Sequence, residues 1–222
     1  MLYRILISKY NKVILSLEQL SDDKQYVLND YLKGNLTEEK FEQLANVWMP
    51  SHHSYQPLID IAKQNNLPVI AADAPNRFVE LVSNRGMNAL DSLDEKSKSL
   101  LPPLPYFINK EAYYNEYVNA YKNTSTISDS GYQSFCLRDA TMAYNIYKFW
   151  KGNPSYKIIH IVGNFHIENN LGTIEQFQHL SNAGFLTISC FYNDDFKKPK
   201  WNKYKGFSDF VIVTDPDIKR SY

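Results

Sequence analysis

The chain has 222 residues, 44% of them hydrophobic, and its 24 lysines and arginines balance its 24 aspartates and glutamates. This length suits one domain, and the balanced charge gives no reason to expect nucleic acid or an anionic membrane surface as a partner. Because no apolar run reaches about 18 residues, we expect no membrane-spanning helix. The start, MLYRILISKYNKVILSLEQ, has no small-residue cleavage site and does not predict a signal peptide.

The first half of the chain alternates short apolar runs with helical patterns. Residues 13–17 (VILSL) are typical of a strand that is buried on both faces. Residues 21–23 (SDD) predict the start of a helix that runs through Leu32. A near capping box at residues 37–40 predicts a second helix, which reaches about Trp48 and is broken by Pro50. We then expect a helix at 55–64 with proline in its first turn, a strand at 68–72 and a helix at 76–85.

The second half continues this alternation after an interruption. Residues 91–105 are predicted to be irregular, with LPPLP as a rigid extended piece. A long amphipathic helix is predicted at 133–150. We also expect helices at 110–122 and 172–182, and strands at 157–162, 185–191 and 210–214.

Strands that alternate with helices predict an α/β fold with a largely parallel central sheet flanked by helices. The helices near residues 37–66 and 92–122 depart from the simple alternation. We expect them to be insertions in a single domain, where they form a helical cap or a side subdomain.

Polar side chains follow several of the predicted strands. Glu18 comes after the first strand, Asp73 after the second and Asp215 after the last, while His166 follows the third by way of Gly163, which permits a sharp turn. Ligands of open parallel sheets bind beyond the carboxyl ends of the strands, so we expect a shared crevice there. The alternative is that each carboxylate caps the next helix, which is the better explanation for Asp215, and that His166 is a surface histidine.

A glutamate and a histidine at one crevice suit two kinds of chemistry. Glu18 and His166 could bind a divalent metal ion, or act as a general base with an orienting acid. A metal site needs at least one more ligand, which Asp73 or Asp215 would supply. Imidazole or oxygen ligation of haem iron is the other use of such groups.

Other features have simpler explanations. His160 alternates with apolar neighbours and is predicted to be a core histidine, whereas His52 and His53 are adjacent and are not expected to hold one metal ion. Cys136 and Cys190 lack CxxC spacing and are predicted to be small core residues. The stretch KKPKWNKYK at 197–205 could contact phosphates, but a solvated loop explains it better.

Four ordered blocks of the sequence carry a resemblance to a known family. They are VILSLEQLSDDKQYVLNDYLKGNLTEEKF, VWMPSHHSYQPLIDIAKQNNLPVIAADAPNRFVELVSNRG, QSFCLRDATMAYNIYKF and HIVGNFHIENNLG. Together they resemble the bacterial ChaN-like haem-binding proteins, in the wider group that includes the Tiki-type metalloproteases and erythromycin-esterase-like proteins. The resemblance implies haem binding for iron uptake or handling, with haem near the contact of a homodimer.

The resemblance also implies roles for single residues. Glu18 and His166 match the family's central polar pocket, and Asp73 stands where the family usually has asparagine. The haem is held through a tyrosine in this family, and Tyr55, close to His53, is our candidate for that ligand. The other motif positions match Asn164, Arg77, Gln133 and Asp139.

Two departures from the family pattern bear on function. The family's Gly-Glu-x-His block has no counterpart in these residues, which weakens a Tiki-type peptidase function. The signal peptide and lipid-attached cysteine of ChaN lipoproteins are also not found, although the family implies a periplasmic or outer-membrane-associated protein. A haem-binding protein is therefore the favoured hypothesis, with a metal-dependent hydrolase that uses Glu18 and His166 as the alternative and an inactive scaffold as a weaker third.

Overall fold

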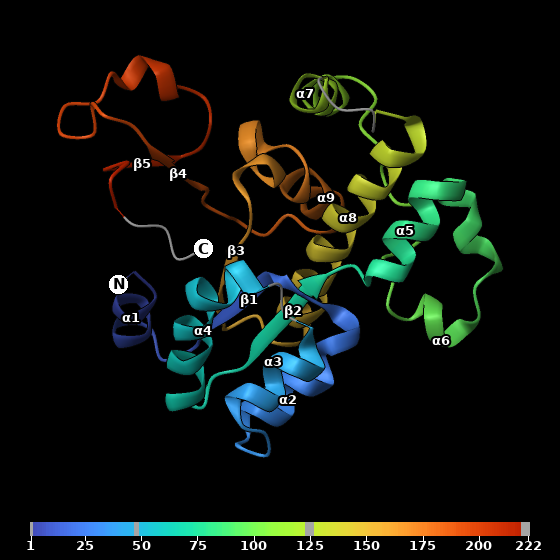
Figure 1. The fold of residues 1–222 in the computed structure, drawn as a ribbon, viewed down its shortest axis with the longest axis horizontal. Coiled ribbons are helices and arrows are strands. Elements are labelled where there is room, and N and C mark those ends of the chain that lie inside the picture. The colour runs from blue at the N-terminus through green and yellow to red at the C-terminus, as the bar shows by residue number, and fades with distance from the viewer. Residues whose placement is uncertain (1, 47–48, 123–126, 219–222) are drawn as a thin grey trace.

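The computed structural model describes residues 2–46, 49–122 and 127–218, except for the side chains of residues 49–54 (Figure 1). The described strands are β1 (Val13–Ser21), β2 (Val69–Asp73), β3 (Lys157–Ile161), β4 (Ile188–Tyr192) and β5 (Phe210–Thr214). The described α-helices are α1 (Leu2–Lys9), α2 (Gln25–Leu32), α3 (Glu38–Ala45), α4 (Met49–Gln64), α5 (Asn76–Arg85), α6 (Glu95–Lys98), α7 (Ala112–Tyr121), α8 (Asp129–Gly152) and α9 (Thr173–Leu180). The fold is α/β, as the alternation of strands and helices predicts.

The strands form two parallel sheets. The first has the order β2-β1-β3, with Leu15 of β1 opposite both Val69 and Ile159. The second is the pair β4-β5, with Cys190 opposite Ile212. Because β1 is the central strand of the first sheet, the carboxyl ends of all three strands reach one rim of that sheet.

Helices cover both faces of the first sheet. On one face, Leu15 and Leu17 of β1 belong to a core that includes Phe41 of α3 and Ala62 of α4. On the other face, Ile14 packs with Met142 of α8 and with residues of β2. The continuous apolar run of β1 is therefore buried on both sides, as its composition predicts.

A second core joins α5 and α7 to the N-terminal half of α8. It is rich in tyrosine and includes Phe78, Leu90, Tyr113, Tyr132 and Leu137. Figure 1 shows α7 beyond the N-terminal end of α8, with α5 and α6 together to one side. This aromatic core supports the part of α8 that faces the rim of the first sheet.

Several predicted boundaries in the first half are wrong. β1 continues to Ser21, with a register shift between Leu17 and Ser21. α3 ends at Ala45, because Asn46 adopts the left-handed conformation with φ 53°. Pro50 does not break a helix but lies in the first turn of α4, where its missing N–H costs little. Pro57, predicted in a first turn, lies inside the same helix.

Further corrections concern the second half. The predicted irregular segment 91–105 contains the short helix α6, which Asp94 caps by accepting a hydrogen bond from the Ser97 N–H at 2.8 Å. Cys136 is buried as predicted, but Cys190 is exposed, and the prediction that it is a core residue is wrong. None of the helices in the described part of the chain has the length and apolar character needed to cross a bilayer.

Candidate functional site

An arginine from α8 joins two carboxylates at the rim of the first sheet. Arg138 Nη2 donates to Glu18 Oε1 at 3.0 Å and to Asp73 Oδ2 at 2.6 Å, and Arg138 Nε lies 3.1 Å from each Asp73 oxygen. The three side chains are 28%, 15% and 10% exposed in that order. Charge pairing and multiple hydrogen bonds offset the desolvation of these groups.

The local backbone explains why both carboxylates reach this rim. Glu18 was predicted to follow the first strand, but it lies inside β1, at the irregular register that precedes Ser21. Such irregularities change the direction in which a strand's side chains point. Asp73 is the last residue of the buried strand β2, and its Oδ1 accepts the Ala74 N–H at 2.8 Å.

His166 joins the same network from the turn after β3. Its Nε2 lies 3.5 Å from Glu18 Oε1, and its Nδ1 lies 2.8 Å from Asp139 Oδ1. Glu18 Oε2 also accepts the Gly163 N–H at 2.7 Å. The structure thus brings together Glu18, Asp73 and His166, with Asp139 behind the histidine.

Asp139 holds His166 in one orientation. This aspartate is fully buried, and it accepts hydrogen bonds from Tyr113 Oη and Thr173 Oγ1, each at 2.8 Å. The Phe135 ring stacks on the imidazole at 4.6 Å between centroids. An Nδ1–H that donates to Asp139 leaves Nε2 facing Glu18.

The buried network shifts the pKa of its members. Burial lowers the pKa of His166, but the adjacent Asp139 and then Glu18 outweigh burial, so the net shift is upward. Burial raises the pKa of Asp73, against the opposing effect of Arg138. Burial disfavours the charged form of Arg138, but Asp73 and Glu18 outweigh it and raise its pKa, so the guanidinium remains a cation.

The predicted role of Gly163 needs correction. Its φ is −60°, which any residue adopts, and an added Cβ would lie 3.6 Å from Glu18 Oε2, an ordinary contact. The constrained glycine is Gly172, with φ 57°. A Cβ there would lie 2.6 Å from the His166 carbonyl oxygen and 2.7 Å from Tyr113 Oη. Gly172 therefore permits the close packing around His166 and Tyr113.

A cavity of about 560 Å³ opens beside this network. Glu18, Asp73 and Arg138 line it at the sheet, and Tyr55 of α4 lines another part of its wall. Arg77 also lines it, half exposed and paired with Asp23 at 2.7 Å. The cavity is thus polar and contains both signs of charge.

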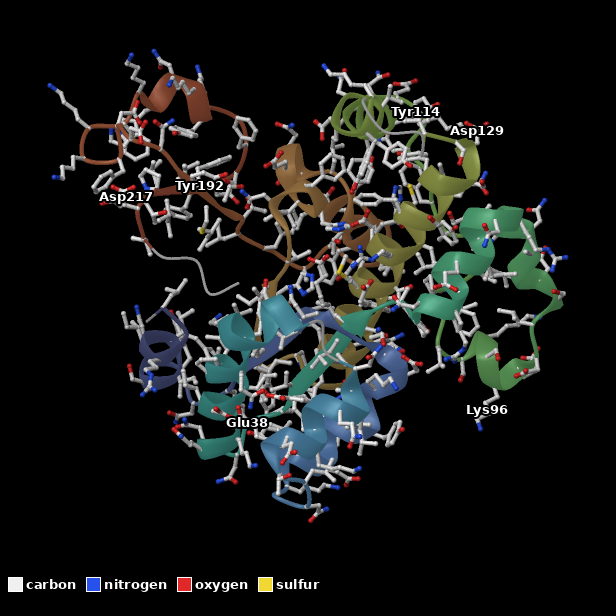
Figure 2. All side chains as sticks on the ribbon, viewed as in Figure 1. Glu38, Lys96, Tyr114, Asp129, Tyr192 and Asp217 are labelled. Atoms are coloured by element: carbon white, nitrogen blue, oxygen red, sulfur yellow. The ribbon has the colours of Figure 1, made fainter. Side chains whose placement is uncertain are left out.

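Other predicted residues lie outside this cavity. The Asn164 side chain bonds the backbone of Cys190, donating to its oxygen at 2.8 Å, and so links the end of β3 to β4. Gln133 Oε1 accepts the Met87 N–H at 2.7 Å. Asp215 accepts the Asp217 N–H at 2.9 Å beyond the second sheet, and Figure 2 shows Asp217 on the far side of the view from Lys96. His53 is on α4, but its side chain is outside the described residues.

Metal ligation has limited support in this geometry. Among the described residues, no group of three His, Cys, Asp or Glu side chains is arranged to hold a metal ion. His160 lies next to the network, with Nδ1 3.0 Å from Ser16 Oγ and a buried Nε2 that has no hydrogen-bond partner among the described residues. Burial lowers the pKa of His160 to about 4, against the opposing effect of Glu18, so it is a neutral imidazole at pH 7.

Three residues that organise the site were not predicted from the sequence. Arg138 supplies the cation, and Tyr113 and Thr173 hold Asp139. One signal was available for Arg138: two carboxylates expected in one buried crevice need a positive partner. No comparable signal in the sequence singled out Tyr113 among 17 tyrosines.

The chain is similar to a known protein family in sequence and to two solved structures in fold. Residues 1–177 match the model of the family described as haem-binding uptake, Tiki superfamily, ChaN. A solved structure of ChaN of Campylobacter jejuni, described as showing cofacial haem binding, is similar with a TM-score of 0.62 and 14% identity, over 85% of this chain and 71% of that one. The structure of a mutant of the erythromycin esterase EreC in its open conformation has a TM-score of 0.49 and 12% sequence identity to this chain. The match covers 86% of this chain and 65% of that one. No curated protein matches the sequence.

Proposed function

The chain belongs to the family of haem-binding uptake proteins that includes ChaN, within the Tiki superfamily, and from this premise we propose that it binds haem for uptake or handling of iron. We further propose that the binding site is the polar cavity at the carboxyl ends of β1 and β2. The observation that carries the proposal is the family match over residues 1–177. The chemistry of the cavity supports the location.

The size and the composition of the cavity suit an exchangeable site. Its volume of about 560 Å³ falls within the range of about 300–1,000 Å³ for cofactor sites. Apolar contact with a porphyrin comes mainly from Ala45 and the Tyr55 ring, and most of the remaining wall is polar. Such a wall covers little of an apolar ring, which favours a haem that enters and leaves over one that is permanently enclosed.

Tyr55 is the iron ligand that we propose. It is a phenol on the cavity wall, and oxygen ligation by tyrosine is an established way to hold haem iron. Burial, and then the nearby Glu18, raise the pKa of Tyr55. Tyr55 would hold the iron as a phenolate and would have to release its proton on binding, so haem affinity should increase as the pH rises.

Cations at the cavity give the haem propionates a place to bind. Arg77 is half exposed, with its guanidinium paired with Asp23 and 4.4 Å from the centroid of the Phe78 ring. Arg138, in contrast, is already paired with Glu18 and Asp73. Lys24 also lines the cavity, with its ammonium 3.1 Å from the Leu44 carbonyl oxygen. Arginine and lysine form charge-assisted hydrogen bonds with carboxylates, so Arg77 and Lys24 are the proposed propionate partners.

Titration with ferric haem tests the function and the location separately. We expect a shifted Soret band that saturates at a fixed stoichiometry. Tyr55→Phe should weaken binding by about tenfold or more and change the spectrum of the bound haem, because it removes the ligand and keeps the ring. Tyr26→Phe is the matched control, since Tyr26 is 65% exposed on α2 and does not line the cavity.

The outcomes distinguish two failures. No saturable Soret shift would refute haem binding by this chain. A normal shift that Tyr55→Phe and Tyr26→Phe affect equally would keep haem binding and refute the cavity as its location. Arg77→Gln should weaken binding without changing the Soret position, because Arg77 is proposed to contact the propionates and not the iron.

A hydrolase is the second candidate, and one observation favours it. Asp139, His166 and Glu18 form a line in which a fixed imidazole faces a carboxylate on the cavity wall. Glu18 would act as a general base or a metal ligand, and Asp139 would orient His166. The competing feature is that Arg138 and the Gly163 N–H already occupy both oxygens of Glu18.

Activity assays separate the two candidates. Ester and peptide substrates would be tested with and without added Zn²⁺ or Mn²⁺, in the wild type and in Glu18→Gln. Turnover that Glu18→Gln abolishes, together with an unchanged haem titration in that variant, would favour the hydrolase. Absence of turnover with a saturable Soret shift would favour the haem-binding protein.

A further inference from the structure

Tyr113 lies at the inner end of the buried network, behind His166. It is on α7, it is 2% exposed, and its Oη donates to Asp139 Oδ2 at 2.8 Å. The other oxygen of Asp139 accepts the Thr173 hydroxyl and contacts His166 Nδ1, each at 2.8 Å. Neither the proposed haem site nor the proposed hydrolase gives the Tyr113 hydroxyl a role of its own.

A buried phenol that donates to a carboxylate is suited to one-electron oxidation. A phenol that loses an electron becomes a strong acid, and a buried cation is costly, so the proton must leave with the electron. The proton acceptor must lie within a hydrogen-bond reach of about 2.6–3.2 Å, and Asp139 meets this condition. Oxidation then converts the anionic Tyr113–Asp139 pair into a neutral pair, which burial favours.

Two other buried tyrosines of the same core donate to neutral groups. Tyr132 Oη donates to the Asn109 carbonyl oxygen. Tyr106 Oη donates to the Gln133 carbonyl oxygen at 2.8 Å. A carbonyl oxygen accepts a hydrogen bond but is too weak a base to take the proton, so Tyr113 differs from these tyrosines in its acceptor and not in its burial.

One tyrosine outside this core also donates to a carboxylate. Tyr31 Oη lies 2.7 Å from Asp60 Oδ1, but the Lys63 ammonium lies 3.7 Å from the centroid of the Tyr31 ring. A cation over an aromatic ring is attracted by its electrons and opposes their loss. In the described part of the chain no cation lies over the Tyr113 ring, so Tyr113 is the easier of the two to oxidise.

Aromatic rings enclose Tyr113. The centroids of the Phe165 and Phe135 rings lie 5.6 and 6.0 Å from that of Tyr113. The Tyr132 ring lies 6.1 Å away, and a Cβ at Gly172 would lie 2.7 Å from Tyr113 Oη. This packing keeps solvent and other chains from the ring, so a radical at Tyr113 should be long-lived.

A chain of contacts connects Tyr113 to the wall of the cavity. The Phe135 ring, next to Tyr113, stacks on the His166 imidazole at 4.6 Å between centroids. His166 Nε2 lies 3.5 Å from Glu18 Oε1, and Glu18 lines the cavity. Electrons tunnel readily through groups in such close contact, so an oxidant in the cavity can draw an electron from Tyr113.

We propose that Tyr113 is a redox-active tyrosine that gives one electron to haem in the cavity after the haem has reacted with a peroxide. The phenol proton passes to Asp139 Oδ2 as the electron leaves, which makes Tyr113 a neutral radical and Asp139 a neutral acid. The haem gains the electron and loses one oxidising equivalent that the peroxide gave it. The choice of oxidant rests on the proposed haem binding, whereas the redox activity of Tyr113 rests on its own contact with Asp139.

Photo-oxidation of the haem-free protein tests Tyr113 without haem. A tris(bipyridine)ruthenium complex, excited by light in the presence of a sacrificial electron acceptor, is the one-electron oxidant, and frozen samples are examined by electron paramagnetic resonance. We expect a long-lived tyrosyl signal that Tyr113→Phe abolishes. Tyr132→Phe and Tyr31→Phe are the matched controls and should keep the signal, since each also removes a buried tyrosine hydroxyl.

Two measurements test Asp139 as the proton acceptor. Asp139→Asn keeps a hydrogen-bond acceptor but cannot take the proton, so it should abolish the long-lived signal although Tyr113 is present. In the wild type, oxidation of Tyr113 should be slower in heavy water than in ordinary water, because the proton moves with the electron. The isotope effect needs no substitution and decides the point even if circular dichroism shows that Asp139→Asn does not fold.

Hydrogen peroxide added to the haem-loaded protein tests the transfer of the electron to haem. We expect the same tyrosyl signal and its loss in Tyr113→Phe. No long-lived signal with either oxidant, a signal that Tyr113→Phe retains, or equal oxidation rates in the two solvents would overturn the proposal.

The two oxidants also separate this proposal from the proposed function. A Tyr113 signal with ruthenium and none with peroxide, in protein whose Soret titration shows bound haem, would refute electron transfer to the cavity. Protein that binds no haem but gives the Tyr113 signal with ruthenium would refute the proposed function and haem as the electron acceptor, and would confirm the redox activity of Tyr113.

Discussion

The two parallel sheets of this protein have similar strand sequences and different surroundings. β1 (VILSLEQLS) and β5 (FVIVT) both begin as runs of apolar and β-branched residues. Leu15 of β1 is completely buried between helices, whereas Ile212 of β5 is 45% exposed. The comparison teaches that apolar sequence is sufficient to predict a strand, but the elements that return to cover it decide whether it becomes core.

The carboxyl ends of the two sheets differ in how far along the chain their carboxylates find partners. At the first rim, carboxylates from β1 and β2 share the guanidinium of Arg138, which lies 120 residues from Glu18 in the sequence. At the second, Asp215 accepts a hydrogen bond from Asp217, two residues away. Long-range pairing at the first rim makes a buried, preorganised network, and local pairing at the second makes a surface turn.

The largest expected effect comes from removing the cation of the first rim. Arg138→Met leaves Glu18 and Asp73 buried without a positive partner and should lower the free energy of unfolding by about 3–5 kcal/mol at pH 7. Urea denaturation measures it. The loss should shrink in mildly acidic buffer, because burial raises the pKa of Asp73 and the variant lacks the arginine that opposes this shift.

Arg77→Met is the matched control for this change. Arg77 forms one surface ion pair and is 51% exposed, so its removal should lower the free energy of unfolding by no more than about 1 kcal/mol. Equal losses in the two variants would show that the Arg138 network is no more tightly coupled than a surface pair.

Substitution of two glycines with positive φ, one in each region, compares how tightly the surrounding atoms constrain the backbone. Gly172→Ala should lower the free energy of unfolding by roughly 3 kcal/mol, because φ is 57° and the new Cβ meets the His166 carbonyl and Tyr113 Oη. Gly206→Ala adds only backbone strain of about 1–2 kcal/mol, because φ is 94° and no atom lies within 4 Å of the new Cβ. Thermal and urea unfolding measure both, and equal losses would contradict the tight packing behind His166.

His160 of β3, whose Nε2 is buried, should give the first sheet a pH-dependent stability. Burial holds the pKa of folded His160 at about 4, below the value of about 6.5 expected on unfolding. The unfolded state therefore binds the proton first, and stability is present above about pH 6.5 and lost as the pH falls towards 4. This loss should amount to about 2–3 kcal/mol at pH 4.

Replacement of His160 separates its contribution to the pH dependence of stability from the contributions of the carboxylates. His160→Gln should flatten the stability curve between pH 6.5 and 4 relative to the wild type, as measured by urea denaturation at each pH. His179→Gln is the control, since His179 lies on α9 outside the network, with its ring 4.2 Å from the Phe107 ring and tilted against it. A curve for His160→Gln that runs parallel to the wild type would refute the buried neutral histidine.

The sequence was a good guide where short-range patterns decide the structure. The apolar run of β1 and the Thr37 cap of α3, which accepts the Lys40 N–H at 3.2 Å, were predicted and are present. The convergence of Glu18, Asp73 and His166 followed from the rule that parallel strands share a rim. These inferences need only neighbouring residues and a fold class.

The sequence was a poor guide where distant residues decide. Cys190 was predicted to be core from its apolar neighbours, but nothing in those neighbours says whether an element returns to cover β4. Asn164 was assigned to the pocket from its motif, and its amide instead bonds the backbone of Cys190. Arg138 went unnoticed because its partners lie 65 and 120 residues away.

The smallest expected effect on stability comes from a cysteine. Each of the two regions contains one cysteine, so thiol labelling measures the exposure of each region. Native protein should react with a maleimide at Cys190 only, and at Cys136 only after unfolding, because Cys136 is 1% exposed in the aromatic core. Cys190→Ser should change the free energy of unfolding of the monomer by less than about 0.5 kcal/mol. Burial raises the pKa of the Cys190 thiol, so the native reaction should be faster at pH 8.5 than at pH 7.

The two native labelling rates test the contrast between the two regions. We expect Cys190 to react much faster than Cys136, because the first thiol is exposed and the second lies in the aromatic core. Equal native rates at Cys136 and Cys190 would contradict this, because the core around α8 would then be as open as β4, and the contrast between the two regions would disappear.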